Sequence, residues 1–116
     1  MLERAVAAVK TDEVKALADF SRGGDGFRDH DLYVFCARTN GMVDAHIDPV
    51  QLGRNIKDLY DVHGVAFGQE IMAVAREGRI EEVSYMWPKP ASRTPAQKVT
   101  FVTKVVDQVC GVGFYK

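Results

Sequence analysis

The sequence predicts an α+β domain in which five strands form one antiparallel sheet with helices on one side. Three observations lead to this fold. Apolar residues recur at helical spacing near the start and in the middle of the chain, an Asn-Gly pair separates two short β-type runs, and three further strand-like runs close the chain. Strands that follow one another closely favour antiparallel pairing. The 116 residues match one hydrophobic core, so we expect a single domain over residues 1–116.

The first predicted element is an N-terminal helix over residues 2–20, either straight or kinked. Apolar residues three and four positions apart define one face of it. Thr11 or Asp12 is suited to capping its second part. A glycine-rich stretch follows Phe20 and ends the helix.

The next two elements are strands over residues 32–38 and 42–47, joined as a hairpin. Asn40-Gly41 suits a two-residue type I′ turn, which would fix the register between the strands. Because strand side chains alternate, one face is then wholly apolar and carries Val34, Cys36, Val43, Ala45 and Ile47. The other face carries Tyr33, Phe35, Asp44 and His46. Aromatic walls with a titratable imidazole are typical of a small-ligand pocket.

Asp48-Pro49 ends the second strand, and a connector without clear periodicity follows. The further main helix, between the second and third strands, has one face marked by Phe67, Ile71, Val74 and Ala75, and Gly78 is placed as the residue after its C-cap. The last three predicted strands cover residues 80–87, 98–105 and 109–115. A polar, proline-rich loop links the first two of them.

Composition excludes several functions. Fifteen basic and sixteen acidic side chains give a net charge of −1, so no nucleic-acid partner is expected. No apolar run reaches the length of a membrane helix, and the first residues do not form a signal peptide. We find no nucleophile–base pair, no phosphate-binding glycine loop and no calcium loop, so we expect neither an enzyme nor a metal site.

Cys36 and Cys110 are 74 positions apart and form no CxxC motif. Each lies in an apolar run, so we expect two buried, unbonded thiols. A disulfide between them is the alternative interpretation.

The chain resembles the single Cache family, the extracytoplasmic, PAS-like sensor domains of bacterial chemoreceptors and histidine kinases. The resemblance covers nearly the whole length. The segments that carry it are Asp31-Leu32-Tyr33-Val34-Phe35, Asn40-Gly41, Ala45-His46, Gly53-Arg54-Asn55, Asp58, Gly64, Phe67, Glu70, Ala75, Tyr85-Met86-Trp87-Pro88-Lys89-Pro90, Lys98, Phe101-Val102 and Gly111-Val112-Gly113-Phe114-Tyr115. The family implies a five-stranded sheet of order 2-1-5-4-3.

Family membership also implies a pocket between the sheet and the connector that holds a small organic acid. The residues we expect to line it are Tyr33, Phe35, His46, Arg54, Phe67, Tyr85, Trp87 and Thr103. His46 or Arg54 would hold the carboxylate. Many relatives carry a lysine at the position of Thr103, so a cation usual for the ligand is expected to be missing here. The alternative roles are a core histidine for His46, plain packing for Tyr85 and Trp87, and a solvated loop charge for Arg54.

The expected function is a sensor module for signal transduction or chemotaxis that binds a short carboxylate and needs no cofactor. Two alternatives remain open: a PAS-like sensor that binds haem or another cofactor, and a stand-alone periplasmic binding protein. The resemblance places the domain in the periplasm or outside the cell. It is compatible with attachment to a membrane-tethered receptor or kinase, and with a homodimer.

Overall fold

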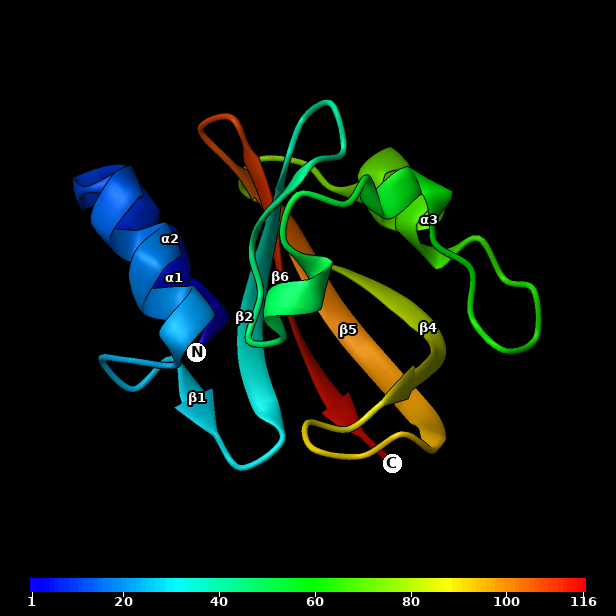
Figure 1. Ribbon diagram of the computed structural model, residues 1–116. Coiled ribbons are helices and arrows are strands. Elements are labelled where there is room, and N and C mark those ends of the chain that lie inside the picture. Colours follow the sequence, from blue (N-terminus) through cyan, green and yellow to red (C-terminus); the bar gives the residue numbers. More distant parts are fainter.

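The computed structural model describes residues 1–116 and places one antiparallel sheet between two layers (Figure 1). The helices are α1 (Leu2–Thr11), α2 (Glu13–Arg22) and α3 (Phe67–Val74), with short 3₁₀ turns η1 (Pro49–Gln51) and η2 (Ile56–Asp58). The strands are β1 (Arg28–Asp29), β2 (Leu32–Arg38), β3 (Val43–Ala45), β4 (Glu81–Pro88), β5 (Pro95–Val105) and β6 (Gln108–Tyr115). None of the helices combines the length and the apolar character needed to cross a membrane.

The sheet confirms the predicted fold class. Its order is β1-β2-β6-β5-β4, with β3 paired to β2, and all pairs are antiparallel. The predicted order 2-1-5-4-3 corresponds to β3-β2-β6-β5-β4, and each of those pairings is present. The difference is β1, a two-residue strand that pairs with the start of β2. Two residues are too few to give an alternating pattern in the sequence.

The N-terminal segment forms two helices rather than one. Asp12 is extended and its carboxylate accepts a hydrogen bond from the backbone N–H of Lys15, so it ends α1 and caps α2. The two helices fold back on each other (Figure 1), and the Arg4 guanidinium on α1 donates to the carbonyl of Gly26 just beyond α2. Gly23, at φ 68°, ends α2 in the left-handed conformation.

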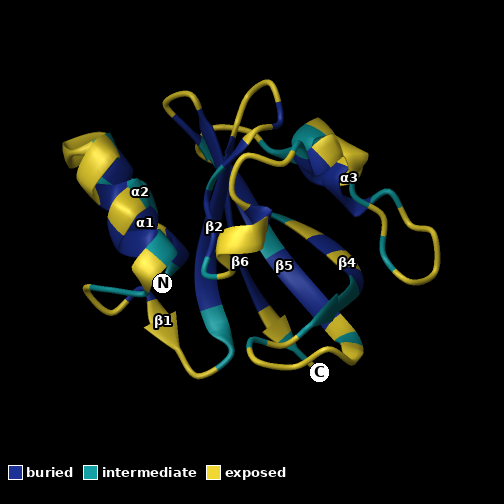
Figure 2. Cartoon of the chain, in the orientation of Figure 1, coloured by how far each residue is buried: buried dark blue, intermediate teal, exposed yellow.

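The helices lie on opposite faces of the sheet, which corrects the prediction that they share one side. The face under α1 and α2, here the helix face, buries aliphatic, phenyl and cysteine side chains. Figure 2 shows buried positions on these helices and on the sheet beside them. The opposite face, here the cavity face, is covered by α3 and by the connector of residues 46–66. α3 ends at Val74, earlier than predicted, because Ala75 is already extended. Gly78, at φ 74°, therefore lies in the turn before β4.

The β2–β3 hairpin keeps only part of its predicted register. Cys36 pairs with Ala45 as expected, but the register shifts at the next position. Gly41 alone has positive φ in the turn, and its N–H donates to the Arg38 carbonyl, so the type I′ turn is wrong. A bulge at Asp44 follows. The bulge moves Val43 to the cavity face, contrary to prediction, and Asp44 turns to the helix face, where Gln108 donates to it.

Cys36 and Cys110 form a disulfide, so the expectation of free thiols is wrong. The two residues are directly opposite in the β2–β6 pairing, with their Cα atoms 4.1 Å apart. The prediction that both are buried is confirmed, since they lie inside the core of the helix face. The pairing of β2 with β6 brings them together, and the local sequence around each cysteine carries no sign of it.

Candidate ligand-binding site

A small cavity lies on the cavity face, beneath the connector and α3. Its volume is about 20 Å³, which is room for about one water molecule. The side chains that line it come from β2, β3, the connector, α3, β4 and β5. They are Tyr33, Phe35, Val43, His46, Gln51, Ile56, Leu59, Phe67, Tyr85, Trp87 and Lys98.

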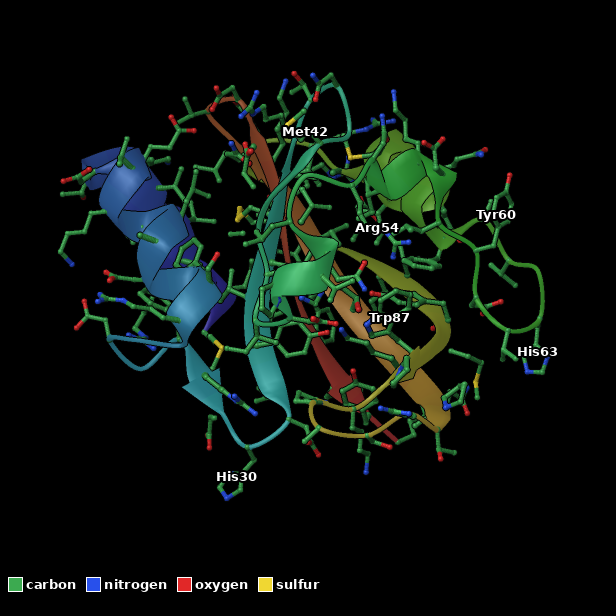
Figure 3. The ribbon with its side chains drawn as sticks, viewed as in Figure 1. His30, Met42, Arg54, Tyr60, His63 and Trp87 are labelled. Carbon is green, nitrogen blue, oxygen red and sulfur yellow. A yellow bond between two sulfur atoms is a disulfide. The ribbon has the colours of Figure 1, made fainter.

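The structure gathers six of the eight predicted site residues around this cavity. They are Tyr33, Phe35, His46, Phe67, Tyr85 and Trp87. Figure 3 shows Trp87 on β4 facing the connector, whereas His30 and His63 project outward from loops. The six predicted residues line one cavity, which agrees with the predicted location of the pocket. Ligand contact by each of them stays a prediction.

Arg54 and Thr103 do not reach the cavity. Arg54 is exposed, and its guanidinium lies 3.4 Å from the side-chain oxygen of Gln51, which itself lines the cavity. Thr103 lies on the helix face, where its hydroxyl donates to the carbonyl of Arg76. Because it is five positions from Lys98 on the same strand, its side chain points to the opposite side of the sheet.

Lys98 supplies the cation that sequence reasoning expected to be missing. Its residue is 1% exposed, and its Nζ lies 3.0 Å from the Tyr33 hydroxyl. The same nitrogen lies 4.4 Å from the ring centre of Tyr33, 5.5 Å from Phe35, 5.4 Å from Tyr115 and 5.8 Å from Tyr85. Lys98 takes part in no salt bridge. Burial lowers its pKa to about 7, since no carboxylate compensates the lost hydration.

A sequence signal for Lys98 exists. Lys98, Thr100 and Val102 alternate along β5, so they share one face of a strand that lies between two others. A lysine in the middle of a three-strand layer is buried on at least one side. The order 2-1-5-4-3 implied by the family resemblance already makes this strand internal, so the signal was available, but it was not applied to Lys98.

Two glycines of β6 make room for this arrangement. A Cβ atom on Gly113 would lie 2.4 Å from Cε of Lys98, and one on Gly111 would lie 2.7 Å from the ring of Phe35. Both distances are far below ordinary contact, so only glycine lets the lysine stem and the phenyl ring cross β6. The Gly-Val-Gly segment thus forms the floor of the cavity.

His46 is a neutral hydrogen-bond donor toward the cavity. Its Nδ1 accepts the backbone N–H of Asp48 at 2.9 Å, so the proton of the neutral ring is on Nε2. Burial and, to a smaller extent, the charge of Lys98 lower its pKa to about 4, while Asp48 acts in the opposite direction. The ring packs 5.1 Å from that of Tyr33.

Aromatic stacking holds the outer wall of the cavity. Phe67 on α3 stacks on Tyr85 with ring centres 4.1 Å apart, and Trp87 meets Phe67 edge-on at 5.2 Å. Thr100 donates to the Tyr85 hydroxyl, and burial raises the pKa of that phenol. These contacts tie α3 to β4 on the cavity face.

A larger outer cleft adjoins the cavity. Its volume is about 650 Å³, and it lies between the turn that follows β3 and the loop of residues 88–93. Four residues line both spaces: Tyr33, His46, Gln51 and Trp87. Arg28, Lys89 and Arg93 also line the cleft. Asp48 is the one acidic residue of the lining, so basic side chains predominate in the cleft and favour the approach of anions.

The arrangement is suited to a small anion with an apolar body. Lys98 offers an ammonium group, Tyr33 and His46 offer neutral donors, and aromatic rings cover the remaining wall. Carboxylates accept from such donors through two oxygens.

Comparison with known proteins gives the same domain type. The family model for Single Cache domain 2 matches residues 7–115. A methyl-accepting chemotaxis protein from Vibrio parahaemolyticus RIMD 2210633 superposes with a TM-score of 0.80 at 24% identity, over 98% of this chain and 82% of that chain. A periplasmic sensor domain of a chemotaxis protein gives 0.77 at 26%, over 97% and 83%. A Cache chemosensory domain that recognises carboxylic acids gives 0.77 at 20%, over 98% and 82%.

Proposed function

The chain belongs to the Single Cache domain 2 family, and from this premise we propose that it is a sensor domain that binds a short carboxylate beside Lys98 without transforming it. The observation that carries this proposal is the uncompensated lysine. A buried amine without a carboxylate partner is costly in the empty protein, and an anionic ligand would supply the missing charge. The structurally similar domain that recognises carboxylic acids supports the same ligand class.

Each neighbour of Lys98 has a role in this proposal. The ligand carboxylate accepts from Nζ of Lys98, from the Tyr33 hydroxyl and from Nε2 of His46. Its short carbon chain lies against Tyr85 and Trp87. Since the cavity holds about 20 Å³, it must widen to admit an organic acid, and the outer cleft provides the adjacent free space.

The need to widen connects binding to signalling. A ligand shifts a conformational equilibrium only if it binds one conformation more tightly than the other. Here the ligand favours the conformation in which α3 and the connector stand away from the sheet. The movement of α3 and the connector is passed to α1 and α2 through β2 and β6, because the side chains of these strands point alternately to both faces.

We also propose that the domain works in the periplasm. The disulfide between Cys36 and Cys110 is of the kind that persists in oxidising compartments. The similarity to a periplasmic sensor domain agrees with this location.

A thermal-shift screen over formate, acetate, propanoate and lactate tests the ligand class. A ligand that binds only the native state raises the apparent midpoint by mass action. We expect a shift that is lost in Lys98→Met and in His46→Ala, and retained in Lys104→Met, a control on the same strand outside the cavity. An equal shift in wild type and Lys98→Met would refute the proposed site, and the absence of any shift would refute the ligand class.

A further inference from the structure

The surroundings of the Lys98 amine suit a nucleophile as well as a cation. Its Nζ has one hydrogen-bond partner, the Tyr33 hydroxyl, and no carboxylate holds it as an ammonium. The four surrounding rings exclude bulk water. The stem is fixed in direction, because it crosses β6 at Gly113, where only a hydrogen atom fits.

We propose that Lys98 binds 2-oxo acids covalently, as a reversible imine between Nζ and the ketone carbon of the ligand. This proposal rests on the proposed carboxylate site. This is a binding reaction, since hydrolysis of the imine returns lysine and the unchanged acid. The ligand class is therefore a short carboxylate with a carbonyl group next to the carboxyl carbon.

The reaction needs no reagent beyond the ligand. The lone pair of Nζ attacks the ketone carbon, an N–C bond forms, and the carbonyl π pair moves to oxygen. The oxygen takes up a proton, and the nitrogen releases one, which gives a carbinolamine. The hydroxyl oxygen takes up a second proton from water, the C–O bond breaks as water leaves, and the nitrogen lone pair forms the C=N bond, which gives a protonated imine.

Two neutral donors are available for the oxygen that leaves. The Tyr33 hydroxyl lies 3.0 Å from Nζ, and the proton of His46 is on Nε2, because Nδ1 is occupied by the Asp48 N–H. Each can donate a hydrogen bond to the carbinolamine oxygen, while the protons that are exchanged come from water in the outer cleft. The released water has a path into the outer cleft, which shares Tyr33 and His46 with the cavity.

The absence of a protein carboxylate beside Nζ of Lys98 also favours a 2-oxo acid over a simple aldehyde as the ligand. A protonated imine is a cation, and no carboxylate of the protein pairs with Nζ. A ligand carboxylate on the adjacent carbon supplies the counter-charge within the adduct itself. The four aromatic rings favour the cationic nitrogen through their faces.

The protonation state of the lysine agrees with this chemistry. Burial lowers the pKa of Lys98 to about 7, so a large fraction of it is a free amine near neutral pH. Exposed lysines are almost wholly protonated at that pH. Desolvated lysines of this kind are the ones that form imines with carbonyl compounds.

Reductive trapping tests the proposal. The protein is incubated at pH 7 with pyruvate and sodium cyanoborohydride, and the reduced adduct is located by intact mass and peptide mapping. We expect one adduct per chain, on Lys98, formed about tenfold or more faster than on any other lysine. Propanoate, which has no carbonyl group, should slow the trapping by competing for the site.

Variants separate this proposal from the carboxylate site on which it rests. Lys98→Met should lose the adduct, and Lys104→Met should keep it. Label spread evenly over surface lysines, with the propanoate thermal shift intact, would overturn the imine and leave the proposed function standing. Loss of both the label at Lys98 and the propanoate shift would overturn both.

Discussion

The two faces of the sheet bury side chains of different chemistry. The helix face packs aliphatic, phenyl and cysteine side chains under α1 and α2 and closes them with a disulfide. It also buries Asp19, Thr103 and Gln108, but each of them has a hydrogen-bond or ion-pair partner. The cavity face buries Lys98 among aromatic rings without a carboxylate partner. Buried apolar surface stabilises a fold, whereas a buried polar group lowers stability unless it is fully paired. The difference indicates that the helix face contributes most to stability and that the cavity face carries an uncompensated polar group.

The largest expected effect is on the helix face. Phe20 is fully buried on α2 and packs edge-on against Phe27 at 4.7 Å. Phe20→Ala should lower the free energy of unfolding by about 3–5 kcal/mol, measured by urea denaturation. Val14→Ala, on the same helix at 80% exposure, should change it by less than about 0.5 kcal/mol. A loss at Phe20 no larger than at Val14 would remove the distinction between the faces.

Burial of Lys98 should lower the free energy of unfolding, whereas burial of Phe20 raises it. Its pKa is lowered to about 7 in the folded protein, so the unfolded chain binds more protons between pH 7 and its ordinary value near 10.5. The free energy of unfolding should therefore rise with pH across this window, and the cost should be fully present below pH 7. The clearest interval is pH 7 to 9.5, below the titration of tyrosines in the unfolded chain.

Lys98→Met should remove this rise and leave the protein about 1–3 kcal/mol more stable at pH 6. Urea denaturation of both proteins at pH 6 and pH 9 measures it. Lys104→Met is the matched control and should follow the wild type. Parallel pH profiles for wild type and Lys98→Met would show that the lysine is not destabilised by burial.

The sequence predicted well which side chains share a face of the sheet where the strands are regular. Alternation along β2 and β4 correctly placed Tyr33, Phe35, Tyr85 and Trp87 on one face, because these strands are regular. His46 also reached that face, although the type I′ turn on which its placement depended is wrong. The Asp44 bulge restored the predicted pairing at Ala45, so the errors of face concern Val43, Asp44 and Ile47, the last of which lies beyond the end of β3 and packs on the cavity face.

The remaining errors concern tertiary pairing. The disulfide arises because β2 lies beside β6, which are far apart in the chain. Lys98 was missed because it begins the predicted strand of residues 98–105, whereas β5 begins at Pro95, so the residue lies inside the strand between β4 and β6. Arg54 was favoured for its charge, yet it is exposed and lies outside the cavity. Local pattern fixes which side chains share a face, and neighbouring strands decide which of them are enclosed.

A smaller effect is expected at the floor of the cavity. A methyl group at residue 113 would displace both Cε of Lys98 and the buried Thr100 hydroxyl, which donates to Tyr85. Gly113→Ala should therefore weaken propanoate binding about tenfold and lower the free energy of unfolding by about 1–3 kcal/mol. Calorimetric titration and urea denaturation measure the two quantities. Unchanged affinity would show that the lysine position is not needed for binding.

The central claim is that an anionic ligand binds against Lys98 and makes it an ammonium. Calorimetric titration of propanoate at pH 8.5, in two buffers of different ionisation enthalpy, tests this most directly. Since the pKa of Lys98 is about 7 in the empty protein, we predict that binding takes up close to one proton per chain and weakens by up to about tenfold per pH unit above neutrality. Tight binding with equal heats in both buffers would contradict the claim.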